Sequence, residues 1–340
     1  MTTGLWYPVY DRHLGWVGMR LDTDVEMASP DFLSQMAADL QAIEAIGSKL
    51  FFVGMDVLTE DMAPAGIEVR IFDAVTACDA PGEAALQDSS RSGVKLFARN
   101  IDSLALFKRC AAQEFDYFTF GRMAYSGNPK EAQDTSRLPL MRLLSLVTSD
   151  ADTAEMEEVF KAEPKLAFEL LRLVNSAALG LRTEITSFAQ AILVVGRRQL
   201  QRWLQLLLFA HRKDGKDGPN ILMQRAAERG RMMEVLAQEG SEKADRELAF
   251  MVGVFSVLDV LMATPLAQLL KSISLPQPVE QALLNREGRL GALLDLVCAA
   301  EESDFAEVGR LLAVLGVEPG TLSRSQLEAI NWAMKIAGTQ

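Results

Sequence analysis

Apolar and polar positions follow two different patterns along this chain of 340 residues. In the first third, short apolar runs such as 5–10, 50–54 and 94–98 alternate with amphipathic stretches and with Gly, Pro or Asp. Short apolar runs bounded by turn residues are typical of buried strands. Their alternation with helical stretches predicts a mostly parallel sheet covered by helices. We therefore expect an α/β region at the N-terminal end, opening with a hairpin over 5–21.

Beyond residue 138 the pattern predicts helices alone. The stretches 165–178 and 197–211 are apolar on nearly every face, which is typical of helices at the centre of a domain. A polar segment with Gly, Asn and Pro precedes them and reads as a linker. We predict an α+β, two-domain chain, with an α/β domain over 1–127, a linker over 128–137 and an all-α domain over 138–340.

The composition excludes several classes of protein. Apolar residues make up 49% and charged residues 24%, which supports well-packed cores. The net charge of −12 repels polyphosphates, so nucleic acid is not an expected partner. The longest apolar run, 248–263, is shorter than the roughly 20 residues of a membrane span and contains Asp259. We expect no membrane segment.

The residues that carry chemistry are sparse. The chain has three cysteines, widely separated, and its N-terminus lacks the pattern of a signal peptide, so we expect a cytoplasmic protein. It has two histidines, His13 and His211, one in each predicted domain. Phosphate-cradling glycine loops and nucleophile elbows are missing from the sequence. We therefore expect no metal and no cofactor.

Several short segments of the helical region resemble, in their order, the HDOD family. They are Leu138-Pro139, LLRLVNSA over 170–177, SFAQAI over 187–192 and VGRRQL over 195–200. HDOD domains are helical signalling modules related to HD phosphohydrolases, usually without the metal ligands. The resemblance implies structural or interaction roles for the signature residues Leu173, Asn175, Ser176, Ser187 and Gly196.

The same resemblance locates the positions where an active HD enzyme holds its metals. The segment GVFSV over 253–257 corresponds to the metal-binding His-Asp segment, and it places Ser256 and Val257 at the ligand positions. Neither side chain is a ligand for a metal that activates water. The resemblance therefore implies a helical domain without its metal centre.

The segment WYPVYDRHLGWVGMRL over 6–21 resembles the opening of an EAL domain, a (β/α) barrel that binds and hydrolyses cyclic di-GMP. Arg20 stands where that family has a metal-binding glutamate, and a guanidinium repels a divalent cation. The stretch 95–118 resembles a later part of the barrel, with Arg99 at an acidic position. Because a full barrel needs roughly 200 residues or more, we predict a partial barrel with a degenerate site.

Together these resemblances predict a tandem EAL–HDOD signal-transduction protein. The first hypothesis is a non-enzymatic adaptor that contacts other signalling proteins, with a homodimer as one form of contact. The second is a sensor that binds cyclic di-GMP or another nucleotide without hydrolysis, through Arg20 and Arg99; the missing barrel half argues against a preformed pocket. The third is a metal-dependent phosphodiesterase with unusual ligands.

Overall fold

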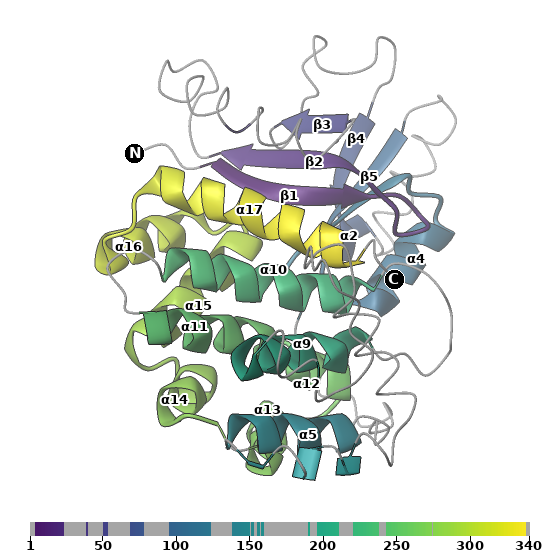
Figure 1. Cartoon of the computed structure of the whole chain (residues 1–340). Helices are drawn as coiled ribbons and strands as arrows, with labels where there is room; N and C mark the ends of the chain where they lie inside the picture. The colour runs from purple at the N-terminus through teal and green to yellow at the C-terminus, as the bar shows by residue number, and fades with distance from the viewer. Residues whose placement is uncertain are drawn as a thin grey trace. The chain divides into compact units, whose positions relative to one another are not determined.

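The computed structural model describes two compact units, whose elements are labelled in Figure 1. The sheet unit comprises residues 1–124 and 295–330, and the helical unit comprises residues 125–294 and 331–340. The described residues are 4–23, 39, 50–53, 69–77, 95–123, 138–149, 151–152, 155–156, 158–159, 190, 196–210, 220–237, 243–273 and 275–337.

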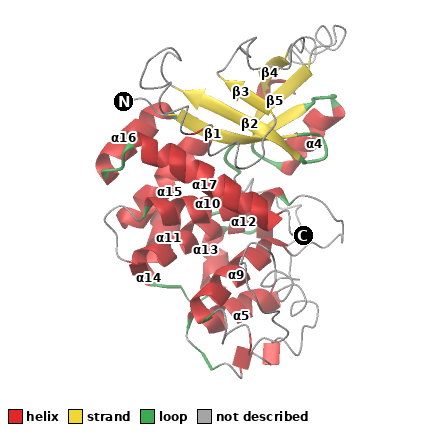
Figure 2. Cartoon of the chain, turned by 45° about the horizontal axis from the view of Figure 1, so that its top comes forward, coloured by secondary structure: helices red, strands yellow, loops and turns green. Residues whose placement is uncertain are grey.

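The sheet unit contains one six-stranded sheet, drawn in yellow in Figure 2, with the strand order β3-β2-β1-β6-β5-β4. Strand β1 runs antiparallel to both its neighbours, whereas β2 pairs with β3, and β6 with β5 and β5 with β4, in parallel. The strands are β1 (Gly4–Tyr10), β2 (Trp16–Thr23), β3 (Leu50–Val53), β4 (Val69–Asp73), β5 (Lys95–Ile101) and β6 (Tyr117–Phe120).

The predicted hairpin is confirmed as β1 and β2, and Asp11 explains its turn. The Asp11 carboxylate accepts hydrogen bonds from the backbone N–H groups of His13 and Gly15, both at 2.8 Å. This local bonding is what makes Asp a common turn residue. Every residue of β1 is buried, in keeping with the near-continuous apolar run from which the strand was predicted.

Two described helices follow the parallel strands, α2 (Ala74–Ala77) after β4 and α4 (Leu104–Ala112) after β5. Ser103 caps α4, because its side chain accepts a hydrogen bond from the backbone N–H of Leu106 at 3.2 Å. Phe107 packs from α4 onto β6, with its ring centroid 4.9 Å from that of Phe118. The predicted α/β alternation is confirmed here.

The C-terminal helices of the sheet unit were not predicted to belong to it. Residues 295–330 hold parts of α15 (Gly288–Glu301) and α17 (Pro319–Ala337) and all of α16 (Phe305–Leu315). On α17 the Ser323 hydroxyl donates to the Gly4 carbonyl at 2.5 Å, and Gln326 Oε1 accepts from the Trp6 backbone N–H at 3.2 Å. Strand β1 is thus bonded to residues more than 300 positions away.

The predicted division of the chain kept all of 138–340 in one helical domain, and that division stays a prediction. The compact units place 295–330 with the sheet instead. The reason is that an amphipathic helix indicates that one face is covered, but not which element covers it. The predicted linker, 128–137, lies outside the described residues. The fold class α+β is confirmed; a partial barrel is not shown, since β3 and β4 are the two ends of the described sheet.

The helical unit is built around α10 (Ile221–Leu236), which is buried on all sides. It packs on α11 (Lys243–Phe255) so closely that a Cβ on Gly253 would lie 2.6 Å from the Arg229 carbonyl carbon. Only glycine permits that approach. The other described helices are α5 (Leu138–Thr148), α9 (Arg197–Ala210), α12 (Leu258–Met262), α13 (Leu266–Leu269), the 3-10 turn η3 (Leu270–Ser272) and α14 (Gln277–Asn285).

Helix α9 confirms the helix predicted from residue 197, and Gly196 precedes it with a φ of +83°. The other signature residues, Leu173, Asn175, Ser176 and Ser187, lie outside the described residues, so their predicted roles stay predictions. Among the helices that are described, none has both the length and the hydropathy required to cross a membrane.

Candidate functional site

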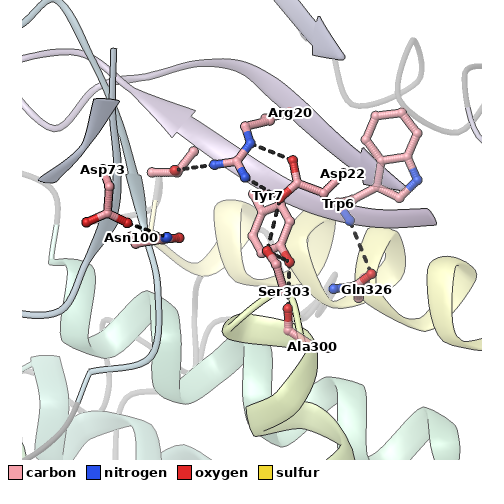
Figure 3. Close-up of polar contacts among 10 residues, drawn as sticks. Trp6, Tyr7, Arg20, Asp22, Asp73, Asn100, Ala300, Ser303 and Gln326 are labelled. Carbon is pink, nitrogen blue, oxygen red and sulfur yellow. Dashed lines mark hydrogen bonds and ion pairs between the residues drawn. The ribbon is translucent and has the colours of Figure 1, made fainter. Parts of the chain in front are cut away.

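Arg20, the residue expected to replace a metal ligand, is buried in a polar network on one face of the sheet (Figure 3). Its side chain is 2% exposed and forms a bidentate pair with Asp22, two residues along the same strand. The Nε–H donates to Asp22 Oδ1 at 2.7 Å, and one Nη nitrogen donates to Asp22 Oδ2. The other donates to Thr119 Oγ1 on β6 at 3.1 Å.

Two further residues of the sheet unit complete the network. The Tyr7 hydroxyl donates to the Ala300 carbonyl at 2.6 Å and lies 2.8 Å from the Ser303 hydroxyl oxygen. Ser303 in turn donates to Asp22 Oδ2 at 3.0 Å. The Arg20 guanidinium lies 5.2 Å from the centre of the Tyr7 ring, within the range of a cation–π contact. The network therefore ties β1 and β2 to the end of α15 and to Ser303, which lies two residues beyond that helix.

Burial of the phenol, and secondly the negative charge of Asp22, raise the pKa of Tyr7 above its ordinary value of 10. The folded unit therefore keeps a proton that the unfolded chain releases above pH 10. The network is arranged around a neutral phenol and an ionised Arg–Asp pair.

The raised pKa of Tyr7 gives a pH-dependent prediction. Stability from this group is fully present below pH 10 and is lost as the pH rises above it, by up to about 1.4 kcal/mol per pH unit. Urea unfolding between about pH 9 and pH 11 should show this decline in the wild type and a smaller one in Tyr7→Phe. An equal decline in the two proteins would show that Tyr7 is not the group responsible.

The network does not fit a divalent metal ion. Both carboxylate oxygens of Asp22 accept from Arg20, whose positive charge opposes a second cation at the same place. Within the part of the chain that the structure describes, no group of three or more His, Cys, Asp or Glu side chains is placed to hold a metal. The network holds the Arg20–Asp22 ion pair in place inside the sheet unit.

The second arginine proposed for ligand binding, Arg99, is not beside Arg20. Arg99 lies half-buried on β5, and β1 and β6 separate β5 from β2 in the sheet. Three strand spacings correspond to about 14 Å between the two backbones. Arg99 instead pairs in register with Asp73, whose carboxylate accepts from the Asn100 side-chain amide at 2.9 Å. These polar residues gather where β4 and β5 end.

The positions expected to have lost HD metal ligands are filled by a different interaction. Ser256 Oγ donates to the Gly253 carbonyl at 2.7 Å and accepts from Arg229 Nη1 at 2.9 Å. Val257 is fully buried. A guanidinium beside the serine hydroxyl makes this place as unfavourable for a divalent cation as the one at Arg20. Of the two histidines, His13 lies exposed in the β1–β2 turn and His211 is outside the described residues.

The arginines at the start of α9 do not all face outward. Arg202 lies 2.6 Å from Glu234 and stacks on the Phe250 ring, with 3.9 Å between the guanidinium carbon and the ring centre. Arg197 donates to the Ala151 carbonyl at 2.7 Å. A basic surface made of the arginines at the start of α9 therefore lacks Arg202.

Sequence reasoning missed Tyr7, Asp22 and Ser303. The signal available for Asp22 was the period of a strand, which places Arg20 and Asp22 on the same face. Ser303 lies 281 residues from Asp22, and no local pattern connects them.

Comparison with known proteins finds a family match in the helical region. The sequence model of the HDOD domain matches residues 139–284, so this stretch of the chain is similar to HDOD domains. The cyclic di-GMP phosphodiesterase CdgJ of Vibrio cholerae is 32% identical over 187 residues, which are 55% of this chain and 43% of CdgJ. The uncharacterised protein YuxH of Bacillus subtilis is 23% identical over 252 residues, 73% of this chain and 60% of YuxH.

Two solved structures are more distant. One, named provisionally as a phosphohydrolase, comes from Shewanella amazonensis SB2B, with 16% identity and a TM-score of 0.43 over 59% of this chain and 92% of that one. The other, named provisionally as a signal transduction protein, comes from Marinobacter aquaeolei VT8, with 13% identity and a TM-score of 0.41 over 99% of this chain and 93% of that one. At these scores neither establishes a shared fold.

The comparisons confirm the HDOD half of the predicted resemblance and show no EAL domain. They contradict the prediction that this chain is not an enzyme, because the relative CdgJ is a named phosphodiesterase. That prediction rested on the loss of ligands at Arg20, Ser256 and Val257. Loss at positions chosen by resemblance does not exclude catalysis by other residues of the chain.

Proposed function

We propose that this chain acts in cyclic di-GMP signal transduction and that cyclic di-GMP is the nucleotide on which it acts. The observation that carries the proposal is its 32% identity to CdgJ over 187 residues, together with its similarity to HDOD domains. The chain spans less than half the length of CdgJ and about 60% of YuxH. The phosphodiesterase activity that is named for the longer CdgJ therefore enters only as part of this proposal.

Cyclic di-GMP is best suited, within the sheet unit, by the end of β4 and β5 that carries Asp73, Arg99 and Asn100. In open α/β sheets, ligands bind beyond the carboxyl ends of parallel strands. Arg99 supplies a guanidinium, the group that best matches a phosphodiester. Asp73 and Asn100 supply a carboxylate and an amide, which suit the hydrogen-bonding edge of a guanine. The buried Arg20, with its bonds to Asp22 and Thr119, is a supporting residue in this proposal rather than a contact.

Calorimetric titration of the whole chain with cyclic di-GMP tests the binding. We expect saturable binding that Arg99→Ala weakens about tenfold or more, since a hydrogen bond to a charged group contributes about 1.5–3 kcal/mol. Arg324→Ala, which removes an exposed arginine from α17, is the matched control and should bind as the wild type does. The absence of any binding heat or thermal shift would end this proposal.

Hydrolysis is measured separately, because CdgJ is a phosphodiesterase. The purified chain is incubated with cyclic di-GMP and Mg²⁺ or Mn²⁺, and the linear dinucleotide is quantified by chromatography. We expect slow formation of that product, and a parallel reaction with a chelator shows whether hydrolysis depends on the added metal. Binding without any product would restrict the role of this chain to recognition.

A further inference from the structure

Arg122 lies two residues beyond the end of β6, at the same edge of the sheet as Arg99 and Asn100. Strands β5 and β6 are parallel neighbours, so their carboxyl ends meet at this edge. The Gly121 backbone N–H donates to the Ile101 carbonyl at 3.1 Å, and a Cβ on Gly121 would lie 3.3 Å from the Asn100 Cα. This close approach of the two backbones sets Arg122 beside the polar end of β5.

Arg122 forms an exposed ion pair at this edge. Its Nη1 donates to Glu302 Oε1 at 3.0 Å, and the two side chains are 39% and 47% exposed. Water competes for both groups of such a pair, which therefore contributes little to the stability of the fold. The Glu302 carboxylate is thus an anion that another anion can displace from Arg122 without loss of the sheet unit.

The turn after α15 fixes the position from which Glu302 reaches Arg122. The next residue, Ser303, donates through its hydroxyl to Asp22 Oδ2 at 3.0 Å, and its hydroxyl oxygen lies 2.8 Å from that of Tyr7 (Figure 3). Both of these partners are buried. Because Ser303 is anchored in this way, Glu302 is presented to Arg122 from a fixed backbone position.

We propose that Arg122 binds the second phosphodiester of cyclic di-GMP, and that Glu302 occupies this place on Arg122 when the ligand is absent. The inference rests on the proposed function, in which Arg99 binds one phosphodiester. A cyclic dinucleotide carries two such groups, and Arg122 is the cation that the neighbouring strand supplies. A guanidinium binds carboxylate and phosphate oxygens through the same fork of N–H donors. Glu302 is therefore an internal competitor of the ligand.

This competition lowers the affinity for the ligand. Arg122 accepts a phosphate only while the Glu302 carboxylate is away, so the observed dissociation constant is the intrinsic one divided by the open fraction of Arg122. Because the ion pair is exposed, the open fraction is substantial and the loss of affinity is about threefold. Removal of Glu302 abolishes this loss, whereas removal of Arg122 takes a charged donor from the ligand.

Calorimetric titration of the full chain with cyclic di-GMP tests this assignment. Arg122→Ala should weaken binding about tenfold, as Arg99→Ala does, and Glu302→Gln should tighten it about threefold. Both variants at the ion pair should melt as the wild type does, because the two side chains are partly exposed. Glu307→Gln, which breaks the exposed pair with Arg310 on α16, is the matched control and should bind as the wild type does.

A double variant separates competition at Arg122 from a general change of charge. In the Arg122→Ala background, Glu302→Gln should leave the affinity unchanged, because the group for which the carboxylate competes is gone. A gain of the same size with and without Arg122 overturns the inference. Binding that Arg99→Ala weakens but Arg122→Ala does not also overturns it, and leaves the proposed function standing. The absence of binding in both the wild type and Glu302→Gln overturns the two together.

Discussion

A fragment of residues 1–127 will not fold on its own. The sheet unit includes 295–330, and the fragment lacks the partners that Ser323 and Gln326 supply to β1. It also lacks Ala300 and Ser303, so the Tyr7 hydroxyl loses the two oxygens near it. We expect the fragment to aggregate or to show no cooperative thermal transition by circular dichroism. The loss of an entire folded unit is the largest effect predicted for this chain.

A protein that joins the two parts of the sheet unit provides the control for this experiment. Residues 4–123 are linked to 288–337 by a Gly/Ser linker of roughly 20 residues, which behaves as a flexible chain of about 25 Å in mean span. The segment 288–337 keeps α15 and α17 whole. We expect cooperative unfolding of the joined protein. A fragment of 1–127 that unfolds cooperatively by itself would instead restore the domain boundary expected from the sequence.

Replacement of Arg20 by methionine should destabilise the sheet unit by about 3–5 kcal/mol. The substitution keeps much of the volume but leaves the Asp22 carboxylate, 3% exposed, without its cation. It also removes the donor to Thr119. Removal of one member of a buried pair costs far more than the pair itself contributes, because the remaining charge stays desolvated. The double variant Arg20→Met, Asp22→Leu should therefore recover most of the loss.

Tryptophan fluorescence can follow this unit separately. Trp6 and Trp16 belong to the sheet unit, whereas Trp203 and Trp332 belong to the helical unit and are replaced by Phe in the background protein. Urea unfolding then reports the sheet unit for each variant. Arg12→Met, at a 45% exposed side chain whose Asp116 contact is 3.5 Å long, is the control. It should change stability by less than about 1 kcal/mol. Equal losses in the Arg20 single and double variants would contradict this account.

Local patterns predicted the elements well and the site poorly. The β1–β2 hairpin, the strands near residues 50 and 95, and helix α9 follow from apolar periodicity and turn chemistry, and the structure confirms them. These features depend on residues within one or two turns of each other. The resemblance to the HDOD family was also readable, because its segments recur in order.

The interpretation of Arg20 was incomplete for a physical reason. The sequence shows an arginine where the resemblance expects a carboxylate, and from this it predicted either a lost metal ligand or a phosphate contact. Burial of that arginine against Asp22, Thr119 and the Tyr7 ring depends on three strands and on a loop near Ser303. Resemblance could not reveal these partners, and it also led to the wrong conclusion that the chain is not an enzyme.

The sequence by itself determined the α+β class, the change from strands to helices and the similarity to HDOD domains. It determined them because propensity, periodicity and motif order act over short distances along the chain. Only the tertiary structure decided that 295–330 belongs with the N-terminal sheet and that Arg20 is an internal ion-pair partner. Those outcomes depend on which apolar faces and buried charges meet, and residues about 300 positions apart contribute to one network.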